Sequence, residues 1–201
     1  MHKSRIVLSD KIRRKVAPLL ADRLADAIDL SLQLKQAHWN VKGPHFIALH
    51  ELFDSVHAVV VAKVDMLAER LTTLGGTAEG TLQAVGKRSS LPGYPVKMTR
   101  GEDHLEAVAA VLAVFGGLTR LAIDICDEAG DKVTADLFNE ITGEMDQQLW
   151  FVEAHLHQRP QQRRRGEHAR RLPELALGAP EAAHAEHGHL EPRGERCAQG
   201  V

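Results

Sequence analysis

Apolar residues recur every three to four positions along four long stretches of the chain, the spacing of amphipathic helices. A short turn containing Gly43 and Pro44 joins the first two stretches, and the segment 129–132 joins the last two. A much longer connection, residues 77–101, separates the two pairs and predicts a short helix near residues 81–85. The long helices are expected at about residues 10–39, 46–74, 102–128 and 133–157.

This order of elements favours an all-α, ferritin-like four-helix bundle, with a long crossover connection carrying a short helix between helices 2 and 3. A generic up-down bundle is the alternative, but it would favour a short middle connection. The chain has 201 residues, 44% of them hydrophobic, which suffices for one sizeable core. Only 4% are aromatic, which favours helices over a β-sandwich.

The helix expected at residues 46–74 carries an apolar face and, beside it, a face of possible metal ligands. On a wheel of about 100° per residue, His50, Asp54, Asp65 and Glu69 lie within about 0–100°, whereas the apolar stripe lies at about 240–320°. Asp54 and Asp65 are about 16 Å apart along the axis, so no single ion can contact both. The apolar stripe comprises Phe53, Val56, Val60, Val64, Leu67, Leu71 and Leu74.

The four possible ligands are placed symmetrically along this helix. The pair His50 and Glu69 and the pair Asp54 and Asp65 share one midpoint, at about residue 59.5. Two copies of the helix, antiparallel about a two-fold axis there, would bring His50 and Asp54 of one chain against Glu69 and Asp65 of the other. The residues nearest that axis are small: Ala58, Val61 and Ala62. The pattern predicts two identical intersubunit sites suited to an ion such as Fe(II), although i, i+4 polar residues also occur on solvated helix faces.

Charge divides the chain into three parts. The first 15 residues carry six Lys or Arg against one Asp, a net +5, and residues 158–201 carry eight Arg against six Glu, a net +2. The middle is therefore at −9 within a total of −2. We expect a basic arm at residues 1–9, a bundle at 10–158 and a largely disordered tail at 159–201, where Arg, Pro, Gly and His accumulate without periodicity.

Two cysteines form no spaced framework, the N-terminus has no apolar leader, and no run of 18 apolar residues occurs. These features predict a cytoplasmic protein that makes no use of a membrane.

Four segments of the chain read KQAHWNVKGPHFIALHELFD (35–54), VDMLAERLTTLGG (64–76), LPGYP (91–95) and QQLWFVEAH (147–155). These segments resemble the Dps family, the miniferritins named for DNA protection in starved cells. The resemblance covers about residues 5–157. It implies a dodecameric shell that oxidises Fe(II), usually with hydrogen peroxide rather than dioxygen, and stores the ferric product as a mineral.

Carried over residue by residue, the resemblance implies a catalytic, iron-binding set of His38, His50 and Asp54 from one subunit with Asp65 and Glu69 from its two-fold mate. His38 enters only through the resemblance, because the spacing argument gives no indication of it. Trp39 adjoins this site in family members, and a core or interface aromatic is its other interpretation.

Two further features have both a functional and a structural interpretation. Acidic residues around the turn at 129–132 line iron-entry pores in similar proteins, or simply form a solvated turn: Glu128, Asp131 and Asp136. Basic residues near the two termini could bind DNA without reading sequence, or only keep the protein soluble: Lys3, Arg5, Lys11, Arg13, Arg14, Lys15, Arg163, Arg164 and Arg165. DNA compaction as the main activity is therefore the alternative function.

Two other metalloenzyme patterns fit less well. A di-iron oxygenase would need Glu-x-x-His pairs on two bundle helices, but this spacing occurs only at Glu181/His184 and Glu186/His189, within the tail. A zinc peptidase would need His-Glu-x-x-His, and here the segment that starts at His50 ends in Asp54.

Overall fold

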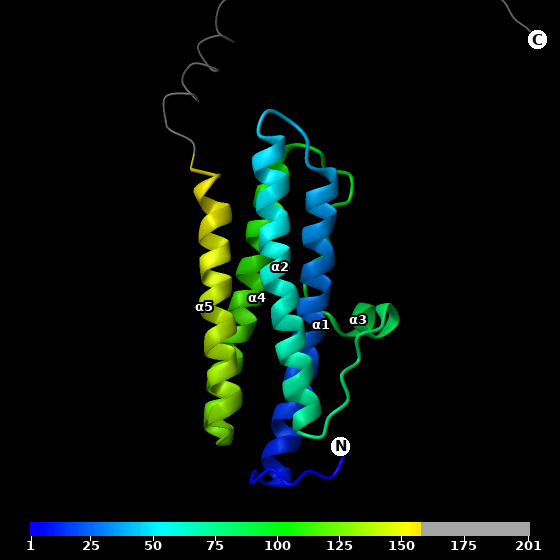
Figure 1. Cartoon of the computed structure of the whole chain (residues 1–201), viewed down its shortest axis with the longest axis vertical. Coiled ribbons are helices and arrows are strands. Elements are labelled where there is room, and N and C mark those ends of the chain that lie inside the picture. The colour runs from blue at the N-terminus through cyan, green and yellow to red at the C-terminus, as the bar shows by residue number, and fades with distance from the viewer. Residues whose placement is uncertain (158–201) are drawn as a thin grey trace, which may run out of the picture. The chain divides into compact units, whose positions relative to one another are not determined.

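A computed structural model of the chain describes residues 1–157, and the expected tail lies outside them. Within this range there are five helices, shown in Figure 1. They are α1 (Asp10–Asn40), α2 (Phe46–Thr73), α3 (Leu82–Arg88), α4 (Gly101–Ala129) and α5 (Lys132–Ala154). The sequence-based prediction of four long helices and one short one is confirmed, with boundaries within three residues.

Local signals explain where these helices begin and end. The Ser9 hydroxyl accepts a hydrogen bond from the Ile12 backbone N–H and caps α1. Gly130 ends α4 in the left-handed region (φ 88°), which glycine adopts without a steric penalty. Asp131 directly follows and caps α5 by accepting from the Thr134 backbone N–H. A turn of two residues therefore suffices to reverse the chain between α4 and α5.

The four long helices pack as two hairpins, α1 with α2 and α4 with α5, around one apolar core (Figure 1). The predicted stripe of α2 lies in this core, although Val64 is only half-buried. Burying such side chains contributes about 1.5–3 kcal/mol each. The largest fully buried side chains are Phe53, Phe115, Phe138, Leu20, Leu24, Leu30, Leu34, Leu67, Leu71, Leu74, Leu112 and Ile141.

The crossover runs from the end of α2 to the start of α4 at the opposite end of the bundle, with α3 outside α1 (Figure 1). A buried carboxylate fixes its middle: Asp26 accepts from the Ser90 backbone N–H (2.7 Å) and hydroxyl (3.1 Å), and from Arg23 Nε (2.8 Å). Gln33 also donates to the Pro92 carbonyl (3.0 Å). These bonds hold the crossover against α1, so that its last residues reach the turn between α1 and α2.

Among the helices described, α4 alone is long and apolar enough to cross a membrane. It is also a core helix that packs against α5 and α1, and 44% of its most apolar window is buried. Buried core helices share that length and composition, so α4 is explained by the bundle.

Candidate metal centre

The two candidate histidine ligands face each other across the turn between α1 and α2. The rings of His38 and His50 stack with centroids 3.7 Å apart and planes 22° apart. His38 Nδ1 lies 2.8 Å from the His50 carbonyl oxygen, and His50 Nδ1 lies 2.9 Å from the His38 carbonyl oxygen. A carbonyl can only accept, so each Nδ1 carries the proton. In the neutral rings both Nε2 atoms therefore keep a lone pair for a metal.

Asp54 lies one helical turn beyond His50, where a lysine holds its carboxylate. Lys35 Nζ donates to Asp54 Oδ1 at 2.6 Å, and His38 Nδ1 is 4.0 Å from the same oxygen. The hydrogen bond from Lys35 lowers the pKa of Asp54, and the charges of Lys35, His38 and His57 act in the same direction. Asp54 is therefore an ionised carboxylate held next to the two imidazoles.

Lys35 is a functional candidate that the sequence did not reveal. It lies in the segment KQAHWN, but nothing in the local pattern connects it to Asp54, 19 residues later. Its ammonium group also lies over the Trp39 ring, 5.9 Å from the centroid. Trp39 itself is 66% exposed, so the single chain does not bury it in the core.

Asp65 and Glu69 lie at the far end of the same face of α2. Both are exposed, and neither side chain makes a hydrogen bond or ion pair among residues 1–157. Between the two ends the face is small and apolar, with Ala58 and Ala62 exposed and Val61 44% exposed. Within the described part of one chain, no three His, Cys, Asp or Glu residues come together to hold a metal. One chain alone therefore contains two separate groups of candidate ligands, with an apolar strip between them.

The structure corrects the expected pore set at Asp131. This side chain is only 2% exposed, receives a hydrogen bond from Arg70 Nη2 (2.8 Å) and caps α5. Its charge stabilises the turn between α4 and α5, so it is not available to a solvent-lined pore. Glu128 and Asp136 are exposed, as a pore would require.

A second correction concerns the basic residues. Arg13 is 6% exposed, donates to the Leu74 carbonyl (3.2 Å) and pairs with Asp10, so it fastens α1 to the end of α2 rather than facing a polyanion. The other five basic residues of the N-terminal set are exposed, whereas Arg163, Arg164 and Arg165 lie outside the described residues. The exposed five are Lys3, Arg5, Lys11, Arg14 and Lys15.

Comparison with known proteins agrees with this architecture. A ferritin-like domain model matches residues 18–161. The DNA protection during starvation protein of Agrobacterium fabrum is 43% identical over 158 residues, covering 79% of this chain and 98% of that protein. The Mycobacterium smegmatis Dps structure is 37% identical with a TM-score of 0.75, covering 79% of this chain and 95% of that one. A Dps structure from Bacillus brevis is 31% identical with a TM-score of 0.70, covering 75% and 100%.

The bundle, its long crossover and the matching domain model define a ferritin-like protein. Within that class, the chain belongs to the Dps family. The family assignment confirms the sequence-based resemblance, while the roles of individual ligands remain predictions.

Proposed function

We propose that this chain oxidises Fe(II), preferably with hydrogen peroxide, at sites shared by two subunits of a hollow dodecamer. It stores the ferric product inside the shell and thereby protects DNA from oxidative damage in the cytoplasm. The observation that supports this most is the division of the ligands on α2: an ordered imidazole and carboxylate set at one end and two unpaired carboxylates at the other.

The donor set suits iron as the substrate. Two imidazole nitrogens and three carboxylates form a mixed nitrogen and oxygen environment, which borderline divalent ions such as Fe(II) accept. Asp65 and Glu69 supply negative charge from one subunit, while His38, His50 and Asp54 supply a preoriented set from the other. Two Fe(II) ions give one electron each, so that peroxide, with two protons, is reduced to two waters without releasing hydroxyl radical.

Lys35 gives this site a competing cation. Its ammonium group occupies Asp54 Oδ1, so an incoming ion must displace that hydrogen bond before it can use the same oxygen.

The apolar strip of Ala58, Val61 and Ala62 is the surface on which the second copy of α2 would pack.

Mixed assemblies test the sharing of sites directly. One variant combines His50→Ala with Asp54→Ala, and the other combines Asp65→Ala with Glu69→Ala. Each variant alone is loaded with Fe(II) without oxygen and then given peroxide. It should oxidise Fe(II) no faster than protein-free buffer does. Unfolded and refolded together, they should recover roughly a quarter of wild-type activity, because half of randomly formed dimers are mixed and each has one intact site of two. No recovery in correctly sized assemblies would disprove intersubunit sites.

DNA binding is the second candidate function, supported by the five exposed basic residues near the N-terminus. Repetition around an oligomer would add many weak phosphate contacts. Gel shifts test this with the full chain, with a variant in which the five exposed residues Lys3, Arg5, Lys11, Arg14 and Lys15 become Gln, and with residues 159–201 deleted. Binding should weaken with added salt, and the absence of any shift at low salt would exclude it.

A further inference from the structure

A buried histidine and the only tyrosine of the chain form a short hydrogen bond near the candidate metal centre. Tyr94 Oη, in the crossover, lies 2.6 Å from Nδ1 of His104, in the first turn of α4. The two rings are stacked, with centroids 6.0 Å apart and planes 21° apart. His104 is 1% exposed and belongs to no candidate ligand set. The iron chemistry proposed above gives this pair no role.

The surroundings of His104 indicate which atom carries the proton. Its other nitrogen, Nε2, is buried without a hydrogen-bond partner of normal geometry. Burial lowers the pKa of His104, and the backbone carbonyls of Met98 and Asn40 act in the opposite direction. The Tyr94 hydroxyl has no other hydrogen-bond partner among residues 1–157, so its hydrogen is directed at Nδ1, and the hydrogen of the neutral ring then lies on Nε2. Nδ1 is then free to accept the phenolic hydrogen of Tyr94.

Burial also raises the pKa of Tyr94. A half-buried phenol and a buried imidazole each resist acquiring charge, so the resting pair is neutral on both sides. The phenolic oxygen lies 2.6 Å from Nδ1 of His104, so that nitrogen can take the proton as the electron leaves.

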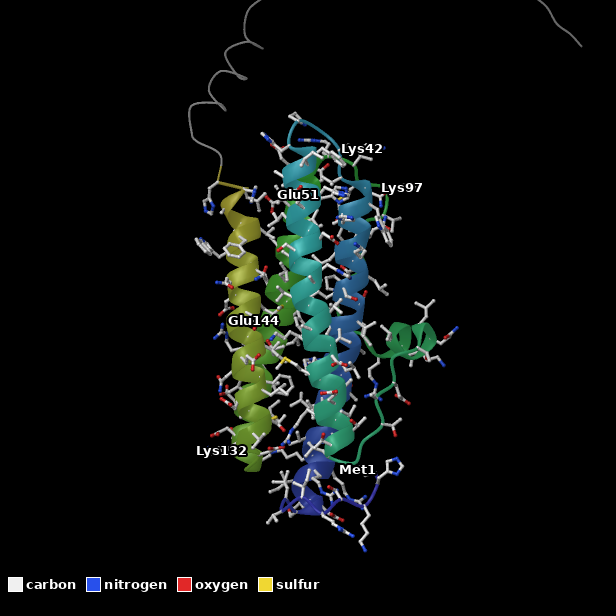
Figure 2. The ribbon with its side chains drawn as sticks, viewed as in Figure 1. Met1, Lys42, Glu51, Lys97, Lys132 and Glu144 are labelled. Atoms are coloured by element: carbon white, nitrogen blue, oxygen red, sulfur yellow. The ribbon has the colours of Figure 1, made fainter. Side chains whose placement is uncertain are left out.

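The pair lies at the end of the bundle that holds the histidine ligands. The Lys42 backbone N–H donates to the Thr99 carbonyl (2.8 Å), which joins the crossover to the turn between α1 and α2. Figure 2 shows Lys42 and Lys97 at this same end of the bundle. The His104 ring is also 6.4 Å, centroid to centroid, from Phe53, which lies on α2 between His50 and Asp54. An aromatic contact therefore links the pair to the helix turn that carries two candidate ligands.

We propose that Tyr94 and His104 form a redox-active pair that consumes stray one-electron oxidants of the hydroxyl radical class. In this step the phenol gives one electron to hydroxyl radical, which becomes hydroxide. The phenolic O–H bond breaks and its proton binds Nδ1, leaving a neutral tyrosyl radical and an imidazolium ion. The proposed function enters only as the source of the oxidant, since the one-electron reaction of Fe(II) with peroxide gives Fe(III), hydroxide and hydroxyl radical.

The structure also favours oxidation of Tyr94 over Trp39, which directly follows His38, and it allows the oxidised tyrosine to be reduced again. The Lys35 ammonium lies 5.9 Å from the Trp39 ring centroid, and its positive charge disfavours a radical cation there. Tyr94 itself lines a surface hollow together with Lys97, Met98 and Thr99. A small one-electron reductant such as ascorbate can return the electron there, after which the proton moves back from His104 to the phenolate oxygen.

Pulse radiolysis of the metal-free assembled protein tests the pair independently of iron chemistry. Azide radicals would oxidise the protein at neutral pH, and transient absorbance distinguishes tyrosyl from tryptophanyl radicals. We expect a tyrosyl signal that Tyr94→Phe removes completely and that His104→Gln forms roughly a hundredfold more slowly, the usual contribution of a positioned base. Tryptophanyl radicals alone, or unchanged kinetics in His104→Gln, would overturn the proposal.

Two controls accompany the pulse radiolysis experiment. Trp150→Phe removes an exposed aromatic on α5 and should leave the tyrosyl yield unchanged. Should His104→Gln fail to assemble, the wild type is compared in ordinary and in deuterated water. If proton transfer is coupled to electron loss, tyrosyl formation must be several-fold slower in deuterated water. Equal rates in the two solvents would contradict the transfer to His104.

A second arm adds peroxide to the Fe(II)-loaded protein, followed by rapid freezing and electron paramagnetic resonance. The wild type should show a tyrosyl radical, and Tyr94→Phe should lose it while oxidising iron at the same rate. Iron oxidation with no tyrosyl radical in the wild type would overturn the protective role. A tyrosyl radical in radiolysis without any iron oxidation would support the pair and refute the proposed ferroxidase function.

Discussion

The two ends of the exposed face of α2 differ in how many of their side chains have hydrogen-bond partners within one chain. At the first end, His38 and His50 are locked by reciprocal hydrogen bonds, and Lys35 holds Asp54. At the second end, Asp65 and Glu69 extend into solvent without side-chain partners among residues 1–157. In the single chain the side chains at the ordered end have a fixed geometry, whereas those at the acidic end contribute only charge until another group meets them. Substitutions at the two ends should therefore have different signatures.

The largest effect is expected from neutralising the acidic end. Asp65→Asn combined with Glu69→Gln should slow Fe(II) oxidation by more than about a hundredfold, since even groups that only support ligands are worth 10–100-fold. Its thermal unfolding should hardly change, because exposed residues without partners contribute within about 0.5 kcal/mol. Stopped-flow oxidation and calorimetry measure the two quantities. A large loss of stability would show that the acidic end is also structural.

The ordered end should affect activity and stability together. His50→Ala removes a hydrogen bond to the His38 carbonyl and the ring stack, and should lower the free energy of unfolding by about 1–2 kcal/mol. Denaturant titration measures this, with Glu69→Ala as the matched control from the opposite end. Equal stabilities of the two variants would remove the proposed difference between the ends.

A smaller effect is expected from Lys35→Met. The hydrogen bond from Lys35 lowers the pKa of Asp54, so this carboxylate stays ionised as the pH falls. Without Lys35 the pKa of Asp54 rises, so this carboxylate should become protonated at a higher pH in the metal-free protein. Carbon NMR of protein labelled at the aspartate carboxyl carbon measures the shift, with Asp54→Asn to assign the signal. Lys42→Met, an exposed lysine at the same end, is the control and should leave the titration of Asp54 in place.

The smallest effect concerns acid stability near the ordered end. Burial lowers the pKa of His104 in the folded protein below its unfolded value of about 6.5. The unfolded chain then binds the extra proton first, so stability should decline as the pH falls from about 6.5 towards the lower folded pKa. His104→Gln should flatten this part of the curve of stability against pH. Denaturant unfolding at each pH measures that curve. A curve unchanged by the substitution would show that other groups cause the decline.

The sequence predicted the helices well because their signals are local. Apolar periodicity, the serine cap and the Gly-containing turns act within a few residues of the positions they determine. The spacing of His50, Asp54, Asp65 and Glu69 could be interpreted for the same reason, since all four belong to one helix.

Other features depend on contacts between distant segments. Lys35 reaches Asp54 across a turn, and Tyr94 meets His104 only once the crossover has folded back along α1. Local sequence does not show burial, so it predicts exposed charges at both Asp131 and Arg13, which the structure buries. Their partners, Arg70 and Leu74, lie 61 residues away in each case. His38 was available only from the family resemblance.

The crossover also divides the candidate residues between two parts of the chain. Every candidate iron ligand lies in the hairpin of α1 and α2, before the crossover begins, while His104 lies in the first turn of α4 and Asp131 closes the turn between α4 and α5. The candidate iron ligands are thus confined to one contiguous half of the bundle. Breaking the chain within the crossover should therefore leave all of them in one fragment. Such a fragment could be recombined with the second hairpin of a relative, which would transfer the candidate iron ligands as a single unit.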